Sequence, residues 1–242
     1  MDPVTTAVVH TAATEALKKE SEGFLKAVLG EPAKALGGIL TDRVNNRRFA
    51  NLVKITVKAK RTLDEAGVSP KEVPLKIIHP MLEAASLEED PDLQTGWANL
   101  MANAADPREN DKILPTFAAI LGELTPGHAL LLSSLYEDAI EKARTRTLPT
   151  EVLYDLFQLK LMFQPPKVPP GPHTAISFTN QFVVVVEVLK RHGLLTERQA
   201  ASETASTQPY SKLKFSISEL GMAFVRACQA PPAAAKSVMP QI

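Results

Sequence analysis

The sequence has few cysteines, few aromatic residues and no long apolar runs. Its single cysteine, Cys228, rules out a disulfide within the chain and fits a reducing compartment. We expect a buried structural thiol there, because no basic pattern nearby would lower its pKa. No apolar run approaches the roughly 18 residues of a membrane-spanning helix, and no signal-peptide pattern opens the chain. The sequence therefore predicts a cytoplasmic protein.

The net charge is zero, since 27 basic residues balance 27 acidic ones. A neutral chain is not, as a whole, an obvious nucleic-acid binder. The charges are nevertheless sorted, with 11 basic against 8 acidic residues in 1–70, 6 against 13 in 71–145, and 10 against 6 in 146–242. The simplest interpretation is that these regions screen one another across internal or subunit contacts.

Catalytic motifs are absent as well. The chain contains no Walker loop, Rossmann glycine fingerprint, zinc-protease histidine pair or nucleophile elbow. Its five histidines are scattered, at His10, His79, His128, His173 and His192. We therefore predict a non-enzymatic protein with no catalytic residue, no cofactor, no metal site and no evident small-molecule substrate.

Helical periodicity is what the chain does have. Hydrophobic residues make up 45% and charged residues 22%, as in globular proteins. An expected N-cap at Asp90, with Pro91 after it, precedes an apolar stripe at helical spacing formed by Leu93, Trp97, Leu100, Met101 and Ala104.

Similar patterns predict further helices before the proline-rich region. The predicted helix over 73–86 has apolar positions at Leu75, Ile78, Leu82 and Ala85. It contains Pro80, which should kink or break it. Thr125 is the expected N-cap of the helix that starts at residue 126. The predicted ranges are 4–28, 33–66, 73–86, 113–124, 126–142 and 150–160.

Proline marks the main expected boundary. Residues 164–172, "QPPKVPPGP", contain five prolines and predict a stiff extended linker. A valine-rich helix from Phe178, strands over 194–198 and 212–218, and a helix over 219–228 then follow in winged-helix order. We predict a mainly α fold, a helical bundle with a C-terminal winged-helix-like segment carrying a small β-hairpin. The expected parts are an N-terminal helix 1–29, a helical core domain 30–163, a linker 164–175, the winged segment 176–230 and a flexible tail 231–242.

Four stretches in this order resemble a known family. "GGILTDRVNNRRFANLVKITVKAKRTLDEAGV" is followed by "VPLKIIHPMLEAASLEEDPDLQTGWANLMANAADP", "LPTFAAILGELTP" and, near the end, "LGMAFVRAC". They resemble the abortive infection alpha family of bacteria over roughly residues 30–230. The resemblance implies an intracellular, mostly helical protein linked to antiphage defence, and it supplies no catalytic residue or cofactor.

Two asparagines share one side of the helix that contains Trp97. Asn99 and Asn103 are four residues apart, so their side chains project about 6 Å from each other. We predict that they are structural polar clamps that hold neighbouring backbone groups, with a ligand or partner site as the alternative. Trp97 itself is expected to pack in the core.

The strongest charge signal is a basic run with no acidic residue inside it. A solvated face or a contact with the acidic middle region is the plainer interpretation, and a membrane surface, a partner protein or nucleic acid is the functional one. The run consists of Arg43, Arg47, Arg48, Lys54, Lys58, Lys60 and Arg61. An acidic cluster should cap a helix and not hold a metal; it consists of Glu88, Glu89, Asp90 and Asp92.

The winged segment raises the possibility of DNA binding. The first residues of its long helix, Thr179, Asn180 and Gln181, would then meet bases. Phosphates would meet Lys190, Arg191, Arg198, Lys212 and Lys214. The proline-rich linker in place of a tight turn, and valines on several sides of the helix, favour a structural or protein-docking module.

The leading functional hypothesis is a non-enzymatic intracellular antiphage protein that acts through protein or membrane-surface contacts. A protein partner or self-association is expected, a membrane surface is possible, and nucleic acid is the less favoured partner. The alternative is a winged-helix DNA-binding regulator.

Overall fold

The computed structural model describes residues 3–30, 43–108, 112–141, 147–149, 174–199 and 213–233. The chain forms two compact units, of which the first comprises Met1–Glu123 and Ala227–Ile242 and the second Leu124–Arg226. The second unit is thus an insertion in the sequence of the first. This division differs from the predicted one, which kept residues 30–163 together and placed the boundary in the linker 164–175.

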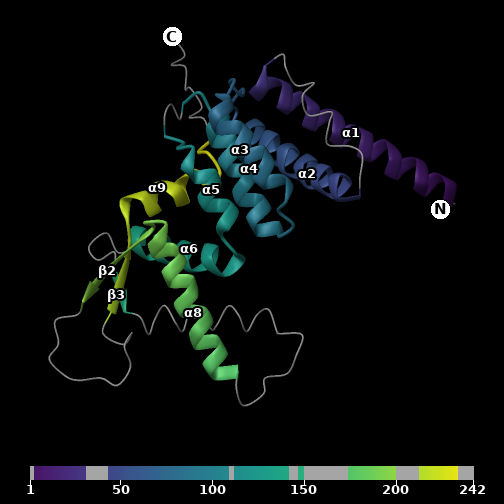
Figure 1. Cartoon of the computed structure of the whole chain (residues 1–242). Coiled ribbons are helices and arrows are strands. Elements are labelled where there is room, and N and C mark those ends of the chain that lie inside the picture. The colour runs from purple at the N-terminus through teal and green to yellow at the C-terminus, as the bar shows by residue number, and fades with distance from the viewer. Residues whose placement is uncertain are drawn as a thin grey trace, which may run out of the picture. The chain divides into compact units, whose positions relative to one another are not determined.

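The first unit is helical, as Figure 1 shows. Helix α2 lies against α1, α3 and α4, and α5 contacts α3 and α4. The bounds are α1 Pro3–Leu29, α2 Arg43–Glu65, α3 Leu75–Ser86, α4 Pro91–Ala105 and α5 Thr116–Glu123. The mainly α prediction is therefore confirmed.

Large apolar side chains from several helices form the core of the first unit. Trp97 is fully buried, as predicted, and Phe24, Ile55, Leu63 and Phe117 are at most 1% exposed. Burial of each such side chain stabilises the fold by roughly 1.5–3 kcal/mol. Phe24 of α1 belongs to this core, so α1 packs as part of the first unit.

Local signals set the limits of α3 and α4. Asp90 is the N-cap of α4, as predicted, and its Oδ1 accepts hydrogen bonds from the backbone N–H groups of Asp92 and Leu93, both at 3.0 Å. Pro80 lies inside α3, which continues through it to Ser86. Of the predicted kink or break, the break does not occur: Pro80 cannot donate to the carbonyl of Lys76, but both residues lie on the exposed side of the helix.

The second unit combines helices with a small sheet. Helix α6 (Pro126–Glu141) contacts strands β1 (Thr147–Pro149) and β3 (Leu213–Ile217), and also α8 (Thr174–Arg191). Strand β2 (Leu195–Gln199) contacts α8, and α9 (Glu219–Ala227) follows β3. The strand order is β1-β3-β2 with antiparallel pairing, Leu195 opposite Ile217 and Leu148 opposite Phe215.

The hairpin strands and the last helix agree with the prediction, and two elements differ from it. Strand β1 was not predicted, because three residues are too few to show an alternating pattern and β1 exists by pairing with β3. Helix α8 begins at Thr174, inside the predicted linker and before the predicted start at Phe178. The helix predicted over 150–160 lies outside the described residues.

A close backbone approach joins α8, β3 and α9. Gly193 ends α8 with a φ of 70°, and Leu194 N–H bonds the carbonyl of Leu189 at 2.9 Å. Ser218 N–H donates to Leu194 O at 2.9 Å, and the Ser218 hydroxyl accepts from Gly221 N–H at 2.9 Å. A Cβ on Gly221 would lie 2.4 Å from Leu194 O, so only glycine fits there.

None of the helices among the described residues has the length and apolarity needed to cross a membrane.

Candidate functional site

The basic run of α2 is largely engaged within the first unit. Arg47 pairs with Glu89 at 2.8 Å, and Arg48 Nε donates to Ser86 Oγ at 2.9 Å. These contacts tie α2 to the turn between α3 and α4. They correspond to the plainer expectation, a contact with the acidic middle region.

The second half of the run has a similar pattern. Arg61 meets both carboxylate oxygens of Glu20 at 3.2 Å, and this hydrogen bonding, followed by the charge of Glu20, raises the pKa of Arg61. Lys60 pairs with Asp64, and Lys58 donates to the Thr95 hydroxyl. Exposed pairs of this kind stabilise a fold little because water screens them, so they mainly reduce the positive charge that α2 offers to a partner.

Two residues of the run, Lys54 and Arg43, are not among these described contacts. Lys54 is exposed and makes no hydrogen bond or ion pair with any described residue. Arg43 is the first residue of α2, and its side chain lies outside the described part of the structure. The seven basic residues thus do not form one free basic surface.

Asn99 and Asn103 hold the backbone that follows the inserted unit. Asn99 Nδ2 donates to the carbonyl of Cys228 at 2.9 Å. Asn103 Nδ2 donates to the carbonyls of Ala227 at 2.9 Å and Gln229 at 2.7 Å. Both asparagines are buried at 9% exposure or less. These are the contacts a structural clamp requires, and their partner is the end of α9 with the residues after it, more than 120 residues away in the sequence.

The ion pair between Arg108 and Asp106 also holds the segment that follows α9. Arg108 forms a two-pronged contact with the fully buried Asp106, the shortest distance being 2.7 Å, and also donates to the carbonyl of Pro232 at 2.9 Å. Burial by itself raises the pKa of Asp106, but the hydrogen bonds and charge of Arg108, with that of Lys71, outweigh it and lower this pKa. The tail predicted to be flexible from residue 231 therefore begins with ordered contacts, since Pro231 is also buried.

Cys228 lies in this anchored segment. It is half-buried, and burial raises the pKa of its thiol to about 12. Such a thiol is protonated and inert at neutral pH, which is what the sequence predicts.

The acidic cluster has structural partners. Besides the Asp90 cap, Glu88 Oε1 accepts from Asp90 N–H at 2.9 Å and Glu89 pairs with Arg47. No group of three or more potential metal-binding side chains occurs among the described residues.

The predicted DNA-contact residues are only partly described. Because α8 begins at Thr174, residues Thr179, Asn180 and Gln181 lie well inside the helix and not in its first turn, where the prediction placed them. Their side chains, like those of Arg198 and Lys214, and the whole of Lys212, lie outside the described part.

The described face of α8 is poorly suited to phosphate. Lys190 pairs with Glu197 at 2.6 Å and with Glu187 at 3.1 Å, and the hydrogen bond to Glu197 is the main cause that raises the pKa of Lys190. Arg191 is exposed, but Val184 of the same helix is 59% exposed as well. This face is apolar and of mixed charge.

Sequence reasoning missed an uncovered face of α3. Leu75, one of the apolar positions of the predicted helix, is 61% exposed, and Leu87 at the end of the helix is 63% exposed. At 100° per residue the exposed side chains span an arc of about 140°. We call this the α3 outer face, and it consists of Leu75, Lys76, His79, Pro80, Glu83 and Leu87.

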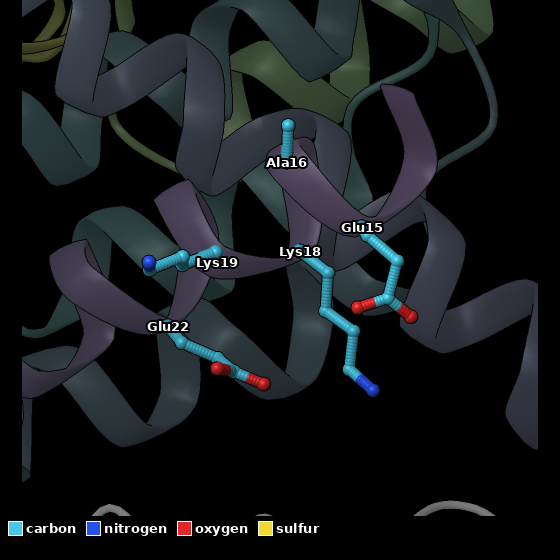
Figure 2. A pocket seen from close by; sticks show the side chains of 5 residues that line it. All are labelled: Glu15, Ala16, Lys18, Lys19 and Glu22. Carbon is cyan, nitrogen blue, oxygen red and sulfur yellow. The ribbon is translucent and has the colours of Figure 1, made fainter. Parts of the chain in front are cut away.

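A shallow pocket lies on α1. Its described lining residues come from this one helix: Glu15, Ala16, Lys18, Lys19 and Glu22. Figure 2 shows Glu15, Lys18 and Glu22 extending outward on the same side of the helix, without converging on one point. Two carboxylates and two ammonium groups so arranged provide no evident chemistry.

A family model described as abortive infection alpha matches residues 45–228. No curated protein and no solved structure matches the chain.

Proposed function

Because the chain belongs to the abortive infection alpha family, we propose that it is a non-enzymatic protein of antiphage defence that acts by binding a protein partner. The family points to a role in abortive infection. The mode of action proposed here rests on the surfaces of the first unit.

The observation that carries the proposal is the α3 outer face. Its inner side is packed, with Ile78, Met81 and Ala85 buried, whereas two leucines at its ends are more than 60% exposed. The face holds one lysine and one glutamate, so it has no net charge. Apolar anchors on a rigid, neutral helix fit a protein surface better than anionic lipid or phosphate.

The contacts that the basic side chains of α2 already make also favour a protein partner over lipid or nucleic acid. Binding to anionic lipid or nucleic acid draws on unpaired Lys and Arg side chains. In the run from Arg43 to Arg61, most described side chains already contact Glu20, Asp64, Ser86, Glu89 or Thr95.

A plating assay with matched variants tests the proposal. Leu75→Asp with Leu87→Asp should abolish protection against phage without changing the melting temperature, because both side chains are exposed. Leu114→Asp is the control, since this leucine is 41% exposed elsewhere in the first unit. Protection retained by the double variant would exclude the α3 outer face, and a wild-type protein that never alters plating would exclude the defence role itself.

Membrane action is separated by a second assay. Leakage of anionic liposomes by the wild-type protein, lost on Arg47→Glu with Arg48→Glu, would replace the protein-partner proposal with a membrane one.

A DNA-binding regulator is the second candidate. The feature that favours it is the third strand, β1, which widens the β2–β3 hairpin into a sheet next to α6 and α8. The engaged Lys190 and exposed Val184 weigh against it. Salt-sensitive binding to duplex DNA, lost on Lys212→Glu with Lys214→Glu, is the result this candidate requires.

A further inference from the structure

His128 is a buried histidine in the first turn of α6. It is 5% exposed. Its Nδ1 accepts a hydrogen bond from the backbone N–H of Thr125 at 3.0 Å and lies 2.7 Å from the Thr125 hydroxyl. A ring nitrogen that accepts from a backbone N–H carries no proton, so the neutral ring has its proton on Nε2 and the hydroxyl is a second donor.

This contact caps α6. In a capping box, the side chain three residues after the N-cap returns to the N-cap N–H, and the residue is usually Glu or Gln. Histidine differs because its ring can take a second proton near neutral pH. Protonated Nδ1 would face the N–H of Thr125 donor to donor, and the hydroxyl can rotate away but the backbone cannot.

The surroundings of His128 favour the neutral ring. No described residue offers Nε2 a hydrogen-bond partner. Burial, and then the charge of His192, lower the pKa of His128.

The other elements packed against α6 bring few ionisable groups. Strand β1 has none, and β3 has only Lys214, whose side chain is outside the described part. On α8, which also packs against α6, Lys190 is held by Glu187 and Glu197, and Arg191 precedes His192.

We propose that the Thr125–His128 cap is a proton-sensitive joint, and that protonation of His128 opens the first turn of α6 and loosens the second unit. This inference is independent of the proposed function. Above about pH 6.5 the histidine is neutral in both folded and unfolded chains, and the Thr125–His128 cap contributes its full stabilisation to the folded chain. Below that pH the unfolded chain takes up a proton that the folded chain resists, so stability falls until His128 itself becomes protonated. One proton corresponds to up to about a tenfold rise in the opening constant per pH unit in this window.

Hydrogen exchange on the full-length protein between pH 7.5 and 5.0 tests the joint, after correction for the intrinsic pH dependence of exchange. Protection of the Thr125 amide and of residues 129–132 should fall in the wild-type protein as the pH drops below about 6.5. His128→Gln should keep protection at all pH values, because a glutamine oxygen accepts from Thr125 N–H and does not titrate. His79→Gln is the control, since His79 is exposed on α3. His192→Gln should retain the response but make it smaller, because the folded pKa of His128 then lies closer to that of the unfolded chain.

Two outcomes would overturn the proposal. One is a response of the same size in His128→Gln, and the other is wild-type protection that does not change with pH. If His128→Gln does not fold, an NMR titration of the histidines in the wild-type protein tests the proposed joint instead. A His128 resonance that titrates at or above pH 6.5 would exclude the joint.

Discussion

Single side chains in this protein connect segments that are far apart in the sequence. Asn103 is the clearest case, because one amide group serves two backbone carbonyls, of Ala227 and Gln229. The bond to Ala227 is buried and that to Gln229 is partly buried, and removing the donor from a buried acceptor costs about 1–3 kcal/mol. Single residues of the clamp therefore carry a large share of a marginal overall stability.

Replacing this amide should be costly. We expect Asn103→Ala to lower the free energy of unfolding by about 1–3 kcal/mol in urea titrations, because two carbonyls lose their donor. Asn46→Ala is the matched control, since Asn46 is exposed on α2. Equal stability of the two variants would show that the Asn103 contacts contribute nothing.

Cys228 should be unreactive in the native protein. Its pKa of about 12 leaves almost no thiolate at pH 7.5, so alkylation by iodoacetamide should be slow and should accelerate as the pH rises. In urea the same thiol should react at the rate of an ordinary cysteine. Native labelling as fast as that of the unfolded chain would contradict the burial of this group.

At the scale of elements, close packing leaves little room around the ends of α8 and α9. Gly221 lies where α9 meets the residue that follows α8, and its backbone is closer to Leu194 O than any side chain permits. The sheet and these helix ends therefore depend on one another. A change at this junction should affect the whole second unit.

Gly221→Ala tests this dependence. The added Cβ would lie 2.4 Å from Leu194 O and 2.7 Å from Ile217 Cγ1, and we expect a loss of roughly 1–3 kcal/mol in the free energy of unfolding. Gly23→Ala is the control, because a Cβ added there would meet no atom within 4 Å and alanine favours the helix by about 1 kcal/mol. A Gly221→Ala protein as stable as Gly23→Ala would contradict the close approach.

Elements were predictable where their signals are local. Asp90 and Pro91 start α4 as expected because a cap acts on the next three residues. The exposure of Leu75 could not be predicted, because helical spacing shows which residues share a face but not whether another helix covers it. The partner of Asn99 and Asn103, strand β1 and the placement of α6 with the sheet depend on contacts between distant residues, which no local pattern encodes.

At the scale of the whole molecule, the first unit is made from two separate pieces of sequence. The piece that begins at Ala227 supplies acceptors for Asn99, Asn103 and Arg108. The chain that leads to this piece passes through the entire second unit. The first unit is therefore complete only when the residues from Ala227 onward, which follow the inserted second unit, have been added.

Truncation variants make this dependence measurable. A chain ending at residue 226 should lose several kcal/mol of stability, because two asparagine amides lose their acceptors and Arg108 loses one of its contacts. A chain ending at residue 233 keeps these contacts and should unfold like the full-length protein. Both can be compared by thermal and urea unfolding, and equal stability of the two truncated chains would show that the anchorage contributes nothing.

The insertion also sets the order in which the protein matures on the ribosome. Helices α1 to α5 are synthesised first, yet the residues that complete their packing appear only after residues 124–226 have been made. At typical rates of translation this interval lasts roughly 5–20 s. A nascent chain interrupted within it carries asparagine amides with no acceptor, so only ribosomes that translate past the insertion release a finished first unit.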